Sequence, residues 1–251
     1  MAREARRAAE AECDLVVFPE FADLGTTLAA ILEHAHPVGT GPWEALTCVA
    51  RDLGIHVIAG LCERDGERIF NTSAVFSPTD GLVAKYRKIH LFSAEPVCEH
   101  EQLTAGDELV IVSIAGIRCG LMICYDLRFP ELARGLALGG AELLIVPAAW
   151  PFPRLSHFKT LTACRAIENQ LYLAAVNRVG IDGPLTYCGG SALLDPYGIP
   201  VTTASEIDPA LLMAEVTTDA VHKTRSHLRV FDDRRPDVYA EFSTPPTEQR
   251  P

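Results

Sequence analysis

Residues 117–146 read IRCGLMICYDLRFPELARGLALGGAELLIV and predict a strand, a helix and a second strand. The run 117–123 is apolar and short enough to be a buried strand. Pro130 suits the first position of a helix, which we expect to end at residue 138, and the apolar run 142–146 predicts the next strand. This alternation favours an α/β domain in which helices cover sheets.

The same patterns continue on both sides of this stretch. Further helices are predicted at 1–11, 42–54 and 156–169, and further strands at 14–19, 55–61, 69–77, 82–88, 109–114, 171–176, 191–194 and 210–216. A long polar loop is expected at 92–106 and a Gly-rich turn after 176. Residues 1–251 therefore predict a single domain, whose polar tail, 219–251, would wrap a surface or a partner subunit.

The charge balance excludes some classes of partner. The 251 residues include 22 basic and 33 acidic side chains, a net charge of -11, which would repel nucleic acid and anionic membrane surfaces. We find neither a signal peptide nor an apolar span of about 18 residues, so we expect a cytoplasmic protein. The eight cysteines are scattered, which predicts reduced thiols and neither a disulfide framework nor a metal site.

Cys124 closes the predicted strand 117–123 and opens the turn toward Pro130. A lone cysteine in such a place is most often a small buried hydrophobic residue. A strand-to-helix turn can also lift a side chain above the sheet edge and aim backbone N–H groups at the same point. Because a free thiol is little ionised at neutral pH, a nucleophilic Cys124 would need a base or a cation beside it.

Glu20 and Lys88 are the candidates for that base and that cation. Glu20 directly follows the apolar strand 14–19, where a carboxyl group withdrawn from water can exchange protons near neutral pH. A carboxylate beside a thiolate is repulsive, and Lys88, at the end of the strand 82–88, would offset that repulsion. Taken alone, Glu20 could be a loop carboxylate and Lys88 a surface lysine.

Together, these three sites resemble the ordered Glu, Lys and Cys motifs of the nitrilase superfamily of carbon-nitrogen hydrolases. The matching runs are FPE at 18–20, YRKIHLF at 86–92 and CYDLRFPE at 124–131, and 165–170 and 189–192 also resemble family segments. The resemblance covers most of the chain and implies a four-layer αββα sandwich, usually assembled as a homodimer. It also implies a second glutamate ahead of Gly106-Asp107, with Glu99 the best match and Glu101 the alternative, which would orient Lys88 and the substrate nitrogen.

Within the superfamily, the chain is most similar to the ω-amidase group, which deaminates 2-oxo acid amides such as 2-oxoglutaramate and 2-oxosuccinamate. The segments that carry this similarity are 150–154, His157, 165–170 and 177–180. The residues expected to contact substrate are Tyr125, Arg128, Trp150 and Arg154. Either arginine could form a bidentate pair with a substrate carboxylate, while Trp150 and Arg154 could equally belong to a packed loop over the sheet end.

The combined hypothesis is hydrolysis of a small carboxamide through a Cys124 thioester, with release of ammonia. Glu20 would take the thiol proton, and Lys88 with the backbone N–H of Tyr125 would hold the oxyanion. No metal or organic cofactor would be needed. The alternatives are an N-carbamoyl amidase, which also releases carbon dioxide, a true nitrilase, and a binding or scaffold protein that keeps the fold without turnover.

One feature departs from the superfamily pattern. Its members usually begin with a strand ahead of the first helix, whereas this sequence starts inside that helix. The first strand is therefore expected to be missing. Its loss would expose a sheet edge and remove buried apolar residues worth about 1.5–3 kcal/mol each.

Overall fold

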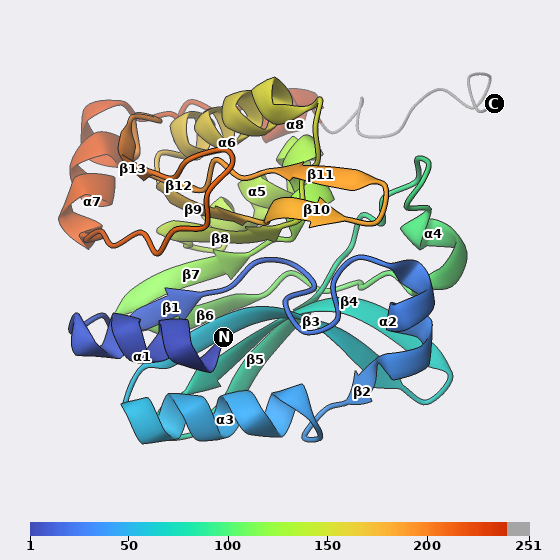
Figure 1. The fold of residues 1–251 in the computed structure, drawn as a ribbon. Helices are drawn as coiled ribbons and strands as arrows, with labels where there is room; N and C mark the ends of the chain where they lie inside the picture. The colour runs from blue at the N-terminus through green and yellow to red at the C-terminus, as the bar shows by residue number, and fades with distance from the viewer. Residues whose placement is uncertain (240–251) are drawn as a thin grey trace, which may run out of the picture.

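Two β-sheets lie face to face between two layers of helices in the computed structural model of the protein, which describes residues 1–239 (Figure 1). The helices are α1 (Ala2–Glu10), α2 (Leu28–His34), α3 (Pro42–Leu53), α4 (Glu99–Gln102), α5 (Pro130–Leu138), α6 (Leu155–Asn169), α7 (Thr218–His227) and α8 (Pro236–Tyr239). A single 3-10 turn, Cys124–Arg128, precedes α5.

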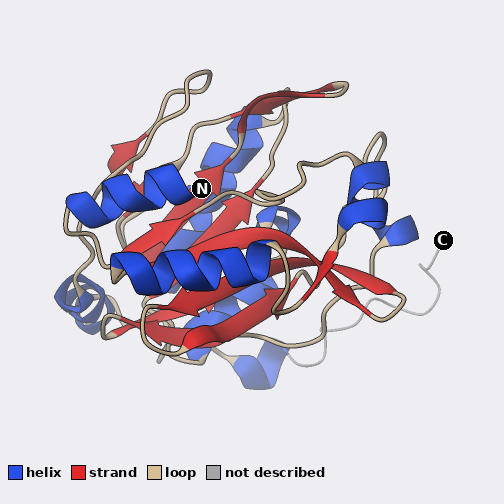
Figure 2. Cartoon of the chain, turned by 60° about the horizontal axis from the view of Figure 1, so that its bottom comes forward, coloured by secondary structure: helices blue, strands red, loops and turns tan. Residues whose placement is uncertain are grey.

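The first sheet is built from the N-terminal third of the chain. Its strands are β1 (Leu15–Val17), β2 (His36–Pro37), β3 (His56–Asp65), β4 (Arg68–Ser77) and β5 (Gly81–Arg87). The order is β1-β3-β4-β5, with β1 parallel to β3, and β2 also pairs with β3. Helices α1 and α3 lie across the outer face of this sheet (Figure 2).

The second sheet holds the strand–helix–strand unit from which the sequence argument started. Its strands are β6 (Ile111–Ile114), β7 (Ile117–Leu121), β8 (Leu143–Ala148), β9 (Tyr172–Asn177), β12 (Ala192–Leu194) and β13 (Pro200–Thr203). They run in the order β13-β12-β9-β8-β7-β6, and β7, β8 and β9 are parallel. Helices α5 and α6 cover the outer face (Figure 1).

The main core fills the space between the two sheets. Ile58 and Val75 of the first sheet and Leu121 and Ile145 of the second belong to one cluster and are fully buried. Because each sheet is apolar on the inner face and also packs helices on the outer face, four layers result. The predicted αββα sandwich is confirmed.

The chain's topology brings three strand ends together. The parallel strands β7 and β8 end at Leu121 and Ala148, and the chain runs on from them to Cys124 and Trp150. From the facing sheet, β1 leads into Glu20. Ligand sites in parallel sheets form beyond the carboxyl ends of strands.

Several elements differ from the prediction. The expected strand 210–216 is wrong: this segment pairs with no strand within residues 1–239, and an apolar pattern without a hydrogen-bonding neighbour cannot form one. The loop 92–106 contains the short helix α4, and helix α2 was not predicted. The Gly-rich segment after β9 forms a hairpin, β10 (Val179–Asp182) and β11 (Leu185–Cys188), turning at Gly183 with φ +55°.

The polar tail is also more ordered than its composition indicated. Helix α7 buries Val221 and Thr224, and Arg225 donates to the carbonyl groups of Ala141 and Asn169. This part of the tail therefore covers its own domain. The rest of the predicted tail, 240–251, lies outside the described residues.

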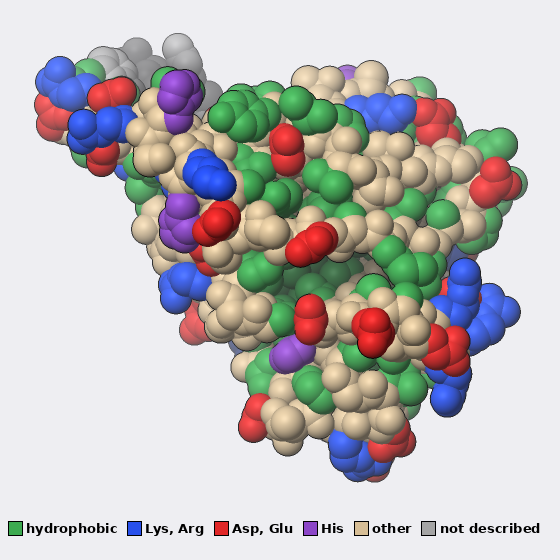
Figure 3. Space-filling model, turned by 90° about the vertical axis from the view of Figure 1, so that its left-hand side faces the viewer, with side chains coloured by type: hydrophobic (Ala, Val, Ile, Leu, Met, Phe, Trp, Pro, Cys, Tyr) green, Lys and Arg blue, Asp and Glu red, His purple; other side chains and the backbone are tan. Residues whose placement is uncertain are grey.

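Acidic and basic side chains are interspersed on the side of the molecule seen in Figure 3, around a hollow with hydrophobic side chains on its floor. This face presents no continuous basic surface. None of the helices between residues 1 and 239 combines the length and the apolar character that crossing a membrane requires.

Candidate active site

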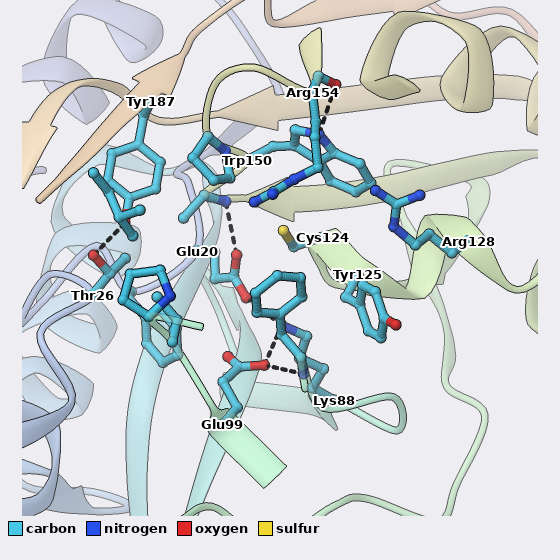
Figure 4. A pocket seen from close by; sticks show the side chains of 17 residues that line it. Glu20, Thr26, Lys88, Glu99, Cys124, Tyr125, Arg128, Trp150, Arg154 and Tyr187 are labelled. Atoms are coloured by element: carbon cyan, nitrogen blue, oxygen red, sulfur yellow. Dashed lines mark hydrogen bonds and ion pairs between the residues drawn. The ribbon is translucent and has the colours of Figure 1, made fainter. Parts of the chain in front are cut away.

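Cys124 sits at the strand-to-helix turn that the sequence predicted. Its backbone has φ +42°, a left-handed conformation that residues other than glycine rarely adopt, and it begins the 3-10 turn. The side chain lines a pocket, with Glu20, Lys88 and Glu99 on one side and Arg128 and Arg154 on the other (Figure 4).

Glu20 reaches this pocket from the end of β1. One carboxylate oxygen, Oε2, accepts the backbone N–H of Ala149 at 2.7 Å, and the side chain is 2% exposed. Gly60 of β3 lies directly against this segment: a Cβ atom there would come within 2.5 Å of the Glu20 Cα. Glycine at position 60 therefore permits the approach that delivers Glu20.

Lys88 joins two buried carboxylates. Its Nζ lies 2.8 Å from Glu20 Oε1 and 2.7 Å from Glu99 Oε2. Burial by itself lowers the pKa of this ammonium, but the charges of the two glutamates outweigh that effect and hold the pKa well above its ordinary value. Lys88 is therefore a permanent cation at physiological pH.

Glu99, and not Glu101, is the second glutamate in contact with Lys88. Helix α4 begins at Glu99, whose Oε2 also accepts the backbone N–H of Phe92 at 2.8 Å. Glu99 is buried, whereas Glu101, two residues further along the same short helix, is exposed. Without α4 the sequence pattern could not distinguish the two.

Asn71 was missed by the sequence argument. Its Nδ2 donates to Glu20 Oε1 at 2.6 Å and to Glu99 Oε1 at 3.0 Å, which closes a ring of four side chains with Lys88. Among residues 1–239, its Oδ1 has no hydrogen-bond partner. The available signal was a buried amide in the middle of the apolar strand 69–77, since such groups require partners.

The charges of this cluster shift the pKa of the Cys124 thiol. Burial and the negative charge of Glu20 raise its pKa well above the ordinary value, while Lys88 and the backbone N–H of Ala149 act in the opposite direction. The resting side chain is thus a neutral thiol. A group that accepts its proton is needed before it can attack.

All four residues predicted to contact substrate line the same pocket. The Arg128 guanidinium lies 4.8 Å from the centre of the Trp150 ring, and that of Arg154 lies 5.5 Å from the centre of the Phe92 ring. Within residues 1–239, neither arginine forms an ion pair with a carboxylate. Trp150 also has a structural contact, because its Nε1 donates to the carbonyl of Arg154 at 2.9 Å.

The opposite wall of the pocket was not predicted. It includes Thr26 and Tyr187, whose hydroxyl groups are hydrogen bonded to each other (Figure 4). Tyr187 belongs to the β10–β11 hairpin, and Asp182 of the same hairpin accepts the N–H and the hydroxyl of Thr26, each at 3.0 Å. The hairpin reaches this wall by long-range contacts that no local pattern signals.

Known proteins share both the sequence and the fold. The sequence model of the carbon-nitrogen hydrolase family matches residues 1–226. A 2-oxoglutaramate amidase of Bacillus subtilis is 34% identical over 227 residues, 90% of this chain and 86% of that protein. A human deaminated glutathione amidase is 34% identical over 256 residues, 96% of this chain and 78% of that protein.

The solved structures agree with these sequence relatives. An amidase mutant from Nesterenkonia sp. AN1, in which acrylamide has added to the active-site cysteine, superposes with a TM-score of 0.82 and 27% identity, covering 96% of this chain and 91% of that one. The family match spans nearly the whole described chain, and the fold agrees with it. This chain therefore belongs to the carbon-nitrogen hydrolase family.

Proposed function

We propose that the protein hydrolyses the C–N bond of a small carboxamide through a thioester on Cys124. The observation that carries this proposal is the Cys124 side chain in a pocket beside one lysine bound to two buried glutamates. That arrangement supplies a nucleophile, a proton acceptor and a fixed cation within one site. These are the parts that acyl transfer from an amide requires.

The first half-reaction forms the thioester. Glu20 takes the Sγ proton, the sulfur attacks the amide carbon, and the carbonyl oxygen becomes an oxyanion. Lys88 and the backbone N–H of Tyr125 hold that oxyanion, each such donor being worth about 2.7–4 kcal/mol. The C–N bond then breaks as Glu20 returns the proton to the nitrogen, and ammonia leaves.

The second half-reaction releases the acid. Glu20 takes a proton from a water molecule, the resulting hydroxide attacks the thioester carbon, and the C–S bond breaks. The thiolate recovers its proton from Glu20, which restores the starting state. Glu99 orients Lys88 throughout, and Asn71 holds both glutamates in position.

We further propose a carboxylate-bearing 2-oxo acid amide, such as 2-oxoglutaramate, as the substrate. Arg128 and Arg154 line the pocket with no carboxylate partner in residues 1–239, although acidic residues outnumber basic ones in the chain. A guanidinium group binds a carboxylate through two parallel hydrogen bonds. The 2-oxoglutaramate amidase among the relatives supports the same choice.

The experiment follows ammonia release from 2-oxoglutaramate, 2-oxosuccinamate, glutamine and an N-carbamoyl amino acid, and release of cysteinylglycine from deaminated glutathione, whose leaving group is an amine other than ammonia. The proposal expects the two primary amides, 2-oxoglutaramate and 2-oxosuccinamate, to react fastest, and intact-mass analysis to find a transient acyl group on Cys124. Cys124→Ala is the control, and it abolishes both signals. Preferred turnover of deaminated glutathione would contradict the proposed substrate and leave the thioester mechanism standing.

Two other outcomes would redirect the proposal. Release of carbon dioxide together with ammonia would identify an N-carbamoyl amidase, the alternative within the same chemistry. If Cys124→Ala changed the hydrolysis of no amide tested, a binding role would replace the proposed enzymatic function.

Replacing Arg128 or Arg154 with Gln separates substrate recognition from chemistry, because it raises KM for an anionic amide and leaves the KM for a neutral amide unaffected.

We also propose that the enzyme works in the cytoplasm as a homodimer. Ile167 on α6 and the neighbouring turn residues Tyr197 and Ile199 are 52%, 58% and 60% exposed. Large apolar side chains grouped on a surface are typical of protein–protein contacts. Light scattering after size-exclusion chromatography measures the mass, and a mass near the 27.3 kDa of one chain would contradict the dimer.

A further inference from the structure

Asp126 is a buried carboxylate that the proposed reaction does not use. It is 0% exposed and lies two residues after Cys124. Four donors surround its two oxygens. Oδ1 accepts the backbone N–H of His90 at 3.1 Å and the ring Nδ1–H of His90 at 2.8 Å. Oδ2 accepts the backbone N–H of Ile123 and the hydroxyl of Tyr86, both at 2.8 Å.

These donors flank both catalytic candidates along the chain. Tyr86 and His90 lie two residues before and two residues after Lys88. Ile123 directly precedes Cys124, and Asp126 itself follows it. A single carboxylate is therefore bound on both sides of the lysine and on both sides of the cysteine, although the two belong to facing sheets.

The backbone at Cys124 needs such support. Its left-handed φ of +42° is a conformation that costs a non-glycine residue about 1–2 kcal/mol. Asp126 closes the turn around it twice, because its backbone N–H donates to the carbonyl of Ile123 at 2.9 Å while its side chain accepts the N–H of Ile123. Strain of this kind persists only where surrounding contacts determine the geometry.

His90 adds a second link between the two segments. Its ring stacks on Phe129, the residue that ends the Cys124 turn, with ring centres 3.7 Å apart and planes 8° apart. Within residues 1–239, His90 is the only basic side chain within ion-pair distance of Asp126. A buried carboxylate whose hydrogen bonds are all satisfied makes its surroundings rigid, so these four donors hold the two segments in one relative geometry.

We propose that Asp126, together with His90, is the positioning element that fixes the Cys124 thiol relative to the Lys88 ammonium. It acts on Lys88 through the Tyr86 hydroxyl and the His90 backbone and ring, and on Cys124 through the backbone of its turn, and it touches no reacting atom. The inference rests on Cys124 and Lys88 acting together as proposed above. It does not depend on which amide is the substrate.

The test measures two quantities in Asp126→Asn, His90→Leu and His90→Asn. The first is kcat and KM on the best amide of the panel, and the second is the rate constant for Cys124 alkylation by iodoacetamide at one mildly alkaline pH. Misplacing a reacting group can cost about 10²-fold, so kcat of Asp126→Asn falls by that order while KM changes less than about threefold. If displacement from Lys88 raises the pKa of the Cys124 thiol by one unit, the thiolate fraction falls and alkylation slows about tenfold.

His90→Leu removes the side-chain donor and is expected to lose about tenfold in kcat, whereas His90→Asn keeps an N–H donor for Asp126 and recovers most of the loss. Glu63→Gln is the matched control, because Glu63 is a buried carboxylate with charged partners away from the pocket. It lowers the melting temperature and leaves the kcat and the alkylation rate unchanged.

Two results would overturn the inference. One is an Asp126→Asn protein that is folded and alkylates and turns over at the wild-type rates. The other is a loss of kcat that follows the fall in melting temperature equally in Asp126→Asn and Glu63→Gln. If no amide is hydrolysed by the wild type, the alkylation series still decides the positioning role, so failure of the proposed function is distinguishable.

Discussion

The meander β3–β4–β5 carries two charge clusters on opposite faces, each built around buried carboxylate groups, and the two differ in their chemistry. The Glu63 cluster consists of Glu63, Thr72, Lys85 and Arg87, and the Lys88 cluster of Glu20, Asn71, Lys88 and Glu99. Adjacent residues of one strand, Asn71 and Thr72, point to opposite faces and so join different clusters. The Lys88 cluster faces the second sheet, and the Glu63 cluster lies on the face that α3 covers in part.

The two clusters differ in their ratio of cations to carboxylates. In the Glu63 cluster one carboxylate meets two cations: burial raises the pKa of Glu63, but hydrogen bonds from Arg87, Lys85 and Thr72 outweigh it and hold that pKa below the ordinary value. In the Lys88 cluster one cation meets two carboxylates, and burial together with the negative charge of Glu20 raises the pKa of the Cys124 thiol. The first arrangement suits stability and the second suits proton transfer.

Removing the glutamate from each cluster gives the largest contrast. Glu20→Gln deletes the proton acceptor, so kcat for amide hydrolysis is expected to fall about 10²–10⁴-fold. Glu63→Gln leaves the pocket intact, and its kcat stays within about twofold of wild type. Steady-state kinetics at a temperature where both proteins are folded measures both kcat values. Equal losses of kcat in the two variants would contradict the distinction between the clusters.

Replacing the lysines tests the same contrast in stability. Lys88→Met leaves two buried carboxylates without their cation and is expected to lower the free energy of unfolding by about 3–5 kcal/mol. Lys85 has a side chain that is 35% exposed, and Glu63 keeps Arg87, so Lys85→Met costs about 1 kcal/mol or less. Urea unfolding followed by circular dichroism measures both values, and a reversed order would refute the charge argument.

Two glycines sharpen the comparison at the backbone. Gly60→Ala drives a methyl group against Glu20 and is expected to lower kcat about 10²-fold by displacing that carboxylate. Gly66, in the β3–β4 turn next to Asp65, has φ +62° and open space around it. Gly66→Ala therefore costs about 1 kcal/mol of stability with normal kcat, and a normal kcat in Gly60→Ala would show that Glu20 tolerates the shift.

The smallest expected effect is the pH dependence of stability. The pKa of Glu63 is lowered on folding, so its stabilisation is present above the ordinary value of 4.5 and is lost as the pH falls through the folded-state pKa. The difference in unfolding free energy between wild type and Glu63→Gln should therefore shrink on the acid side.

The pKa of Lys88 is raised, so its contribution to stability is complete below pH 10.5 and is lost only as the pH rises through the raised value. Urea unfolding over a pH series measures both limbs, and wild-type and Glu63→Gln curves that stay parallel at acid pH would contradict the prediction.

Much of the fold could be predicted because its signals are local. The β7–α5–β8 unit follows from an apolar run, a proline at a helix start and a second apolar run, and helix α5 has the predicted bounds. The segment 210–216 fails for the converse reason, because its strand pattern is local but a strand requires a neighbour. Helix α7 shows that a polar composition does not prevent a helix that buries a narrow stripe.

In the candidate site, too, the features with local signals could be predicted and those that depend on long-range contacts could not. The sequence by itself determined that Glu20, Lys88 and Cys124 each stand at the end of a strand, because periodicity and turn chemistry are properties of neighbouring residues. Only the tertiary structure decided that Asn71 bridges two glutamates, that Glu99 and not Glu101 meets Lys88, and that Tyr187 closes the pocket wall. These contacts join residues far apart in the chain, and they depend on how two sheets pack, which no local pattern encodes.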